Sequence, residues 1–225
     1  MDSEPVGSLP VTRAAEASLV ELRDGSQVLI RPVHSDDAPL LEEGFSRLSA
    51  ESRRLRFLTD KPRLSPAELH YFTHVDHHDH EAIGALDAHD GRGLGIARYI
   101  RDPDRPDVAE VAVAVVDDWQ QRGLGAELLH RLFVRAREEG VRRFTALVDE
   151  DNQAVTGLLA STGAEVRVTE HGAGAITFEI EPRPEGRGAE LQHLLRAVGR
   201  GQVTVPAAIR DAIARLVPER FHTPV

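Results

Sequence analysis

The chain has 225 residues, of which 41% are hydrophobic and 28% are charged, and its formal net charge is -10 at pH 7. This acidic charge argues against a general nucleic-acid binder, and the absence of cysteine excludes a disulfide framework, a thiolate metal site and a cysteine nucleophile. No apolar run approaches the roughly 20 residues that cross a bilayer, and residues 1–5 lack the basic and apolar regions of a signal peptide, so we expect a cytoplasmic protein with no membrane partner.

Composition divides the chain into three parts. Residues 1–18 are small, polar and proline-containing, which is typical of a flexible arm, whereas residues 19–182 carry the strand and helix patterns of one folded domain. Residues 183–225 begin with a proline- and glycine-rich linker and continue with two short amphipathic helical patterns, at 190–198 and 206–216. We therefore predict a short helical tail outside the main core.

The first half of the domain predicts a hairpin, three short helices and three strands. Asp24-Gly25 between two apolar runs is typical of a hairpin turn. Ser49 and Ser65 each stand where a helix N-cap is expected, and Pro66 is favoured in a first helical turn. The expected elements are a hairpin at 19–31, helices at about 36–48, 50–57 and 66–72, and strands at 82–86, 94–100 and 108–116.

The most informative segment is the strand at 108–116 and the residues that follow it. Apolar residues recur at helical spacing from Leu124, and Gly140 stands where a left-handed C-terminal stop is expected. Gly123 and Gly125 allow the backbone to approach a ligand closely, and the first helical turn offers N–H groups and a positive dipole end that suit a phosphate or pyrophosphate. A strand at 143–148, a helix at 152–161 and strands at 165–168 and 176–180 are expected to follow.

Glu110 is the carboxylate of chemical interest in this strand. By strand alternation it shares one face with Ala112 and Ala114, whose small side chains leave a groove. A half-buried carboxylate in such a groove is suited to accept a proton as a general base. An edge glutamate that faces solvent and pairs with Arg98 or Arg101 explains the same position, and the residue pattern alone does not separate the two interpretations.

The segment 74–80 is rich in histidine and offers side chains that bind divalent metals. However, His80-Glu81 is followed by Gly84 where a zinc hydrolase helix would place a second histidine. A solvated loop is the favoured interpretation, and no functional metal is expected.

The segment from Val113 to Gly125, with Gln120-x-x-Gly123-x-Gly125 on a strand-to-helix turn, resembles the acetyl-CoA-binding signature of the GNAT N-acetyltransferase superfamily. The likeness extends over about residues 19–180 and is to bacterial protein lysine acetyltransferases of the Pat type, without a cyclic-nucleotide-binding domain. The segments that carry it are 22–25, 30–32, 48–53, 55–57, 97–99, 101–103 and 109–113. The resemblance implies an α+β fold of three α/β/α layers, with a mostly antiparallel mixed sheet that splays at its fourth strand and helices on both faces.

The resemblance also implies roles for individual residues, with acetyl-CoA as cosubstrate. The backbone of the splayed strand would bind the pantetheine arm, the turn amides would hold the pyrophosphate, and Glu110 matches the glutamate taken as general base. Asn152 matches an asparagine that contacts the cofactor, although a plain helix N-cap explains it too. The cofactor-binding residues implied are Val113, Ala114, Val115, Gln120, Gln121, Arg122, Gly123, Leu124, Gly125, Ala126 and Asn152.

The implied reaction is direct transfer of acetyl from acetyl-CoA to a lysine side chain of a protein, with enzymes like acetyl-CoA synthetase as the implied substrates. Leu159 stands where many relatives carry a proton-donating tyrosine, so no general acid is assigned. Two alternatives stay open: a GNAT enzyme that acts on a small-molecule amine, and a non-catalytic sensor that binds acetyl-CoA. The sequence identifies neither the acceptor nor the oligomeric state.

Overall fold

The computed structural model describes residues 17–172 and 174–182. The predicted tail at 183–225 lies outside these residues, as does the predicted arm except for its last two positions. The strands are β1 (Ser18–Glu21), β2 (Gln27–Pro32), β3 (His80–Asp87), β4 (Gly93–Arg101), β5 (Val108–Val115), β6 (Arg143–Asp149), β7 (Glu165–Gly172) and β8 (Ala175–Glu181). The helices are α2 (Ala38–Ser46), α3 (Ala50–Phe57), α4 (Pro66–Thr73), η1 (Asp117–Trp119), α5 (Leu124–Glu138) and α6 (Gln153–Ser161).

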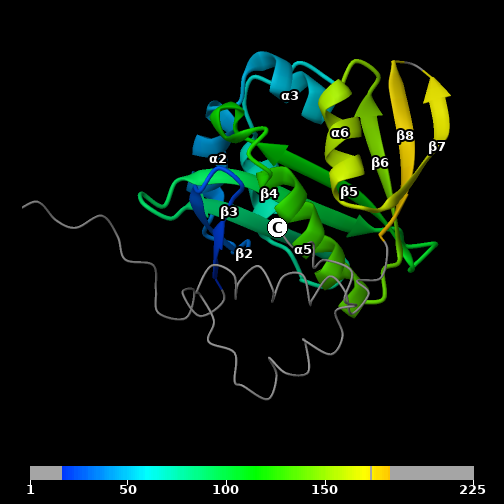
Figure 1. Ribbon diagram of the computed structural model, residues 1–225, viewed down its shortest axis with the longest axis horizontal. Coiled ribbons are helices and arrows are strands. Elements are labelled where there is room, and N and C mark those ends of the chain that lie inside the picture. The colour runs from blue at the N-terminus through cyan, green and yellow to red at the C-terminus, as the bar shows by residue number, and fades with distance from the viewer. Residues whose placement is uncertain (1–16, 173, 183–225) are drawn as a thin grey trace, which may run out of the picture. The chain divides into compact units, whose positions relative to one another are not determined.

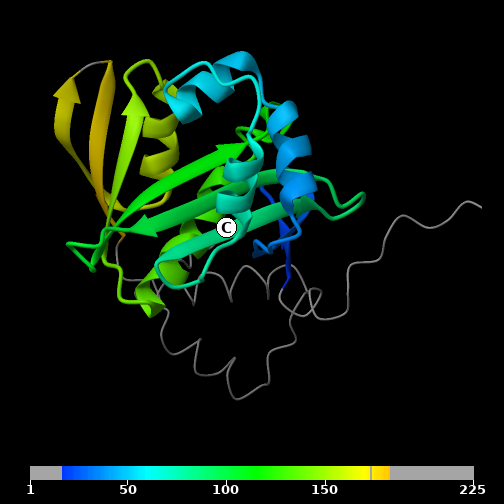
Figure 2. The same ribbon diagram turned by 180° about the vertical axis from the view of Figure 1, so that it is seen from behind.

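The strands form one eight-stranded sheet in the order β1-β2-β3-β4-β5-β6-β8-β7. Neighbouring strands are antiparallel except β5 and β6, which are parallel. Helices α5 and α6 lie on one face (Figure 1), and α2 and α4 lie on the other (Figure 2). The expected three-layer α+β fold with a mostly antiparallel sheet is therefore confirmed.

The sheet splays between β5 and β6. These strands pair only over three residues, the last being Glu110 opposite Thr145, whereas β4 continues to pair with β5 as far as Val115. Beyond Glu110 the two strands diverge and leave a wedge, over which α3 lies (Figure 1). The expected splay is present, but it falls at the fifth strand rather than the fourth, because β1 adds a strand at the edge of the sheet.

The helix starts follow from local side-chain chemistry. The Ser49 hydroxyl accepts the N–H three residues further on at 3.1 Å, and Ser65 and Glu68 form a reciprocal capping box. Helix α2 begins slightly later than predicted, after Asp37, whose carboxylate makes no cap bond. It is engaged instead by the Arg31 guanidinium, through two contacts of 2.6 and 2.7 Å.

The main core lies between α5 and the sheet. The apolar stripe of α5 packs against the β4 and β5 side chains Ala97, Tyr99 and Val111. The opposite face of β5, which carries Glu110, Ala112 and Ala114, is turned toward α2, α3 and α4, as strand alternation predicts. The stripe residues are Leu124, Leu128, Leu129, Leu132, Phe133 and Ala136.

Strand β7 is twice as long as predicted. Its second half is polar and exposed, so it carries no apolar alternation that a sequence analysis would recognise. Backbone pairing with β8 continues to the end of the strand and determines its length. None of the described helices is long and apolar enough to cross a membrane.

Candidate functional site

A groove with a volume of about 500 Å³ occupies the wedge between β5 and β6. Residues 111–115 of β5 form one side, and α3, α6 and residues 146–148 of β6 form the others. The groove extends to the turn before α5. The predicted cofactor residues that line it are Val113, Ala114, Val115, Gln120, Gln121, Gly123, Gly125, Ala126 and Asn152.

Two predicted residues do not line this groove. Leu124 is only 1% exposed and belongs to the core. The Arg122 guanidinium lies over the Trp119 ring, 4.8 Å from its centre, and pairs with Asp24 at 3.3 Å. The Leu124 side chain therefore packs in the core, and the Arg122 side chain contacts Trp119 and Asp24. Only the backbone groups of these two residues remain candidates for ligand contact.

Alternate backbone groups of β5 face the wedge. Val116 N donates to Leu94 O at 2.9 Å, so this residue, and every second residue before it, bonds to β4. The N–H and C=O groups of Val113 and Val115 consequently face the side from which β6 has diverged. Ala114 directs its own backbone groups to β4, so it contributes a small side chain rather than backbone hydrogen bonds to a ligand.

The turn before α5 presents several N–H groups together. Gln121 and Gly123 both adopt positive φ, of 61° and 92°, and Gly123 is the N-cap of α5. The first intrahelical bond runs from Glu127 N to Gly123 O at 3.1 Å, so the amides of residues 124–126 precede any helical acceptor. This arrangement, with the positive end of the helix dipole, suits an anionic ligand such as a pyrophosphate.

Gly125 places the least possible bulk where this turn meets the groove. A Cβ added there would lie 3.3 Å from Leu158 Cδ1 and 3.7 Å from Val115 Cγ2, both on groove-lining residues. We expect Gly125→Ala to weaken acetyl-CoA binding by roughly tenfold, about 1.4 kcal/mol, in isothermal titration calorimetry. Its melting temperature should change little, because the helix preference of alanine opposes the cost of displacing Leu158.

Gly172→Ala is the matched control for this prediction. A Cβ at Gly172 would have no neighbour within 4 Å, and the residue lies in β7, away from the groove lining. We expect its acetyl-CoA affinity to equal that of the wild type. Wild-type affinity in Gly125→Ala as well would show that the ligand does not approach this turn.

The position of Asn152 is consistent with both of its predicted roles, as a helix N-cap and as a residue that contacts the cofactor. Its Oδ1 accepts the Val155 N–H at 3.3 Å as the N-cap of α6, and the residue also lines the groove. The side-chain amide is left as the donor toward a ligand. Leu159, at the position where a proton-donating tyrosine is usual, is 3% exposed and lines the groove with an apolar side chain.

Glu110 lies at the last paired position before the strands diverge. The expectation of half-burial is wrong, because its side chain is exposed where the splay leaves it uncovered. The alternative interpretation is confirmed in that Glu110 faces solvent, but its pairing is wrong: Arg98 donates to Phe72 O at 3.0 Å, and Arg101 pairs with Asp79 at 2.7 Å. The carboxylate is thus accessible for proton transfer.

Side chains of helix α3 bond to residues on both sides of the wedge. These contacts were not predicted from the sequence. The Ser52 hydroxyl donates to Asp117 at 2.9 Å and accepts from the Gln120 side chain at 3.3 Å. Arg54 pairs with Asp149 at the end of β6 at 2.5 Å. The only signal available was the resemblance of residues 48–53, which indicated no contact. These bonds position α3 as a wall of the groove.

The histidine-rich segment uses its side chains in structural contacts. His77 bonds to buried Glu81 at 2.8 Å, and His78 bonds to Glu139 at 2.6 Å. Burial, together with the nearby Arg98 charge, lowers the pKa of His80 to about 4. Across 17–172 and 174–182, no group of three or more potential ligand side chains is placed to hold a metal ion.

Comparison with known proteins relates this geometry to a family. A model described as "Acetyltransferase (GNAT) family" matches residues 46–164. The chain is 35% identical over 144 residues to an acetyltransferase of Pseudomonas aeruginosa, covering 63% of this chain and 77% of that protein. It is 33% identical over 165 residues to the acetyltransferase Pat of Mycolicibacterium smegmatis, covering 73% of this chain but only 49% of that relative.

Solved structures agree with these relatives. The GNAT domain of S. lividans PAT has a TM-score of 0.69 at 32% identity, covering 77% of this chain and 99% of that domain. The Salmonella typhimurium protein yncA, solved with its cofactor acetyl-CoA, has a TM-score of 0.57 at 20% identity and supports the fold alone. It covers 71% of this chain and 96% of that structure. The family match includes β5, the glycine turn and α6, which together form most of the groove. The chain therefore belongs to the GNAT family, which uses acetyl-CoA, and it is an acetyltransferase.

Proposed function

We propose that residues 19–182 form a catalytic domain that transfers acetyl from acetyl-CoA to a lysine side chain of a protein, with Glu110 as general base. The observation that carries this proposal is the layout of the wedge along β5. Exposed Glu110 stands where the strands part, the backbone edge that β6 has left follows, and the glycine turn lies at the far end. Acceptor, thioester and pyrophosphate would thus be bound in sequence along one strand.

The residues of the groove fit acetyl-CoA as cosubstrate. Val113 offers its N–H and C=O, and Val115 its N–H, on the side from which β6 has diverged, so an extended pantetheine arm with amide groups would pair with them as an added strand. The Val115 carbonyl accepts from the Gln120 side chain at 3.1 Å. The amides of residues 121–126 would hold the pyrophosphate. Asn152 would donate its side-chain amide to the arm from the opposite wall.

Proton removal is the chemical problem that Glu110 would address. A lysine amine with a pKa near 10.4 is neutral in only ~0.04% of molecules at pH 7, a handicap of about 4.6 kcal/mol. The exposed carboxylate at the mouth of the wedge would take this proton, directly or through one water. The N–H of Val113 or Val115 would donate to the carbonyl oxygen as negative charge develops there. The thioester supplies the activated acetyl group.

A protein acceptor is supported by the Pat relatives, which share about a third of their residues with this chain over the matched region. The chain spans about half the length of the M. smegmatis relative. A substrate shared with that protein is therefore part of our proposal. Enzymes of the acetyl-CoA synthetase type are the proposed substrates. A cytoplasmic location remains part of the proposal.

The proposal is tested by incubating the protein with acetyl-CoA and purified candidate substrates, and mapping acetylated lysines by mass spectrometry. We expect one or a few lysines to be modified, and only when acetyl-CoA is present. A parallel panel of free amines covers the small-molecule alternative, which the net charge of -10 keeps open because polyamines are cationic. Modification of free amines alone would exclude the protein acceptor, and acetyl-CoA binding without any transfer would favour the sensor.

A further inference from the structure

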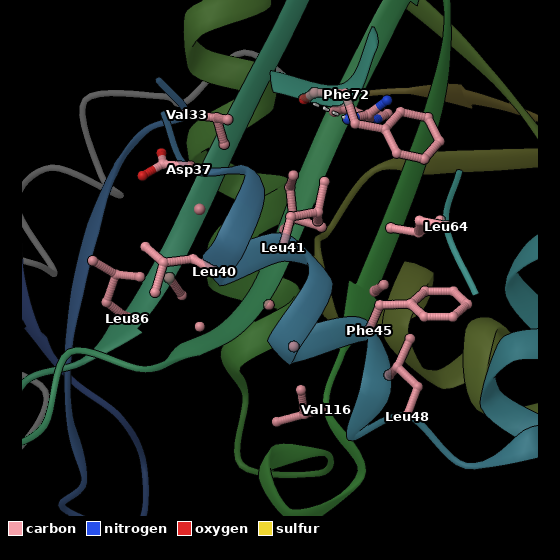
Figure 3. A pocket seen from close by; sticks show the side chains of 18 of the residues that line it. Val33, Asp37, Leu40, Leu41, Phe45, Leu48, Leu64, Phe72, Leu86 and Val116 are labelled. Carbon is pink, nitrogen blue, oxygen red and sulfur yellow. Dashed lines mark hydrogen bonds between the residues drawn. The ribbon is translucent and has the colours of Figure 1, made fainter. Parts of the chain in front are cut away.

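A second pocket, of about 100 Å³, lies under α2 on the Glu110 face of the sheet. Leu40, Leu41 and Phe45 of α2 line it together with Phe72 of α4 (Figure 3). It adjoins the cofactor groove, because Leu48, Arg56 and Ala114 line both. Most residues that line this pocket are apolar, and the charged ones are Arg31, Asp37, Arg56 and Arg98. Charged side chains in such apolar surroundings indicate what kind of ligand the pocket could bind.

Arg98 is one of these groups, and its hydrogen bonding is incomplete. Its side chain projects from β4 on the same face as Glu110 and is 5% exposed. One amino group donates to Phe72 O at 3.0 Å, and the guanidinium lies over the Phe72 ring, 4.0 Å from its centre. The other amino nitrogen, Nη1, is buried and has no hydrogen-bond partner among residues 17–172 and 174–182. A buried donor left unpaired in this way is costly.

Arg56 of α3 adds a second guanidinium to the same pocket. It is half-buried and lies 5.0 Å from the centre of the Phe57 ring, and within the described part of the chain it forms no ion pair. Burial lowers the pKa of Arg56, and the Glu110 charge partly opposes that shift. Burial and the proximity of Arg56 lower the pKa of Arg98 to about 9. The two cations are thus close enough to repel each other in a site of low polarity.

The acids of the pocket do not compensate these charges. Asp37 lines the pocket, but both of its oxygens are bound by Arg31, at 2.6 and 2.7 Å. Glu110 acts on Arg56 through space without an ion pair to it. In a chain with a net charge of -10, two neighbouring arginines that form no ion pair within the described residues are therefore a local exception beside the cofactor groove. A planar guanidinium with free donors is well matched to a carboxylate.

We propose that Arg56 and Arg98 form a carboxylate-binding subsite, which takes a carboxyl group carried by a substrate of the transfer reaction. This inference rests on the proposed function and narrows its substrate class. The pocket has about two-thirds of the roughly 150 Å³ that binds benzene, so it has room for a carboxylate and a methylene group, and the rest of the substrate would lie in the adjoining groove. The carboxylate is either at the end of an acyl chain or on an acidic side chain of the protein acceptor, next to the modified lysine.

Matched substrate pairs test the subsite and distinguish the two sources. Succinyl-CoA is compared with 4-oxopentanoyl-CoA, which has the same number of heavy atoms in its acyl group and no charge. A lysine peptide with glutamate next to the lysine is compared in the same way with the peptide that carries glutamine there. We expect at least a tenfold preference, in Kd by calorimetry and in kcat/KM, for the charged member of one pair, and that pair identifies the source. No preference in either pair would overturn the proposal.

Arg56→Gln and Arg98→Gln are expected to reduce this preference to about one. Arg53→Gln is the matched control on α3, because the Arg53 side chain lines neither pocket and bonds to the backbone oxygens of Leu48 and Pro62, and it should keep the wild-type preference. Arg56 is half-buried, so its variant remains informative if Arg98→Gln fails to fold. If Arg56→Gln keeps the wild-type preference for the charged substrate of the pair, Arg56 is not part of a carboxylate-binding subsite and the proposal is contradicted. If the wild-type protein binds acyl-CoA but transfers no acyl group to any acceptor, the transferase proposal is contradicted. The ratio of the two Kd values in each substrate pair, measured by calorimetry, still tests the subsite.

Discussion

Glu110→Gln is expected to lower kcat by roughly 10²–10⁴-fold, the usual contribution of a positioned general base. The glutamine side chain keeps the shape of glutamate but accepts no proton at neutral pH. Because Glu110 lies outside the groove lining, the Kd for acetyl-CoA should stay within about twofold of the wild type. Steady-state kinetics and calorimetry on the same preparation measure the two quantities.

Glu179→Gln is the control for this substitution. Glu179 lies on β8 opposite Thr145, which itself lies opposite Glu110, so the control removes a carboxylate from the same row of the sheet. It stands two strands away from Glu110, and its kcat should match the wild type. Wild-type kcat in Glu110→Gln would refute the role of Glu110 as base, whereas equal losses in both variants would indicate a general effect of charge.

Asp37→Ala is expected to lower the free energy of unfolding by about 3–5 kcal/mol. The substitution leaves the Arg31 guanidinium without its bidentate partner, and this side chain is only 2% exposed. Asp37 also accepts the His34 N–H at 2.8 Å, just before α2, so the turn that places α2 on the sheet loses a bond as well. Urea unfolding measures the effect.

Glu127→Ala is the matched control for the ion pair. Glu127 pairs with Arg131 at 2.7 Å on the surface of α5, and pairs of this kind contribute about 0.3–0.5 kcal/mol. We also expect replacement of both Arg31 and Asp37 by apolar residues of similar volume to recover much of the lost stability, because no buried charge then remains. A loss below about 1 kcal/mol in Asp37→Ala would show that the pair is effectively solvated.

The sequence predicted those parts of the fold that depend on neighbouring residues. Ser49, Ser65 and Asn152 were identified as helix N-caps, and each makes the expected bond to a nearby N–H. The late start of α2 was not predictable, because the Asp37 carboxylate bonds to Arg31 rather than to its own helix. The polar half of β7 was missed for a similar reason, since pairing with β8 determines its length.

The candidate site shows the same division. Residues 113–126 were predictable as one group because strand, turn and helix follow each other directly, and most of them line the groove. The exposure of Glu110 depends on where β6 leaves β5, which no local pattern encodes. Arg56 and Arg98 were missed as a pair because α3 and β4 meet only in the folded chain, where Arg98 turns to Phe72 instead of pairing with Glu110.

Hydrogen exchange at individual β5 amides tests most directly whether the open strand edge binds the cosubstrate. Saturating acetyl-CoA should slow exchange at the Val113 and Val115 amides by at least tenfold, because these amides face the wedge. The amides of Ala112 and Ala114, which face β4, should change much less and serve as internal controls. Unchanged exchange at Val113 and Val115 under saturating acetyl-CoA would contradict binding along this strand.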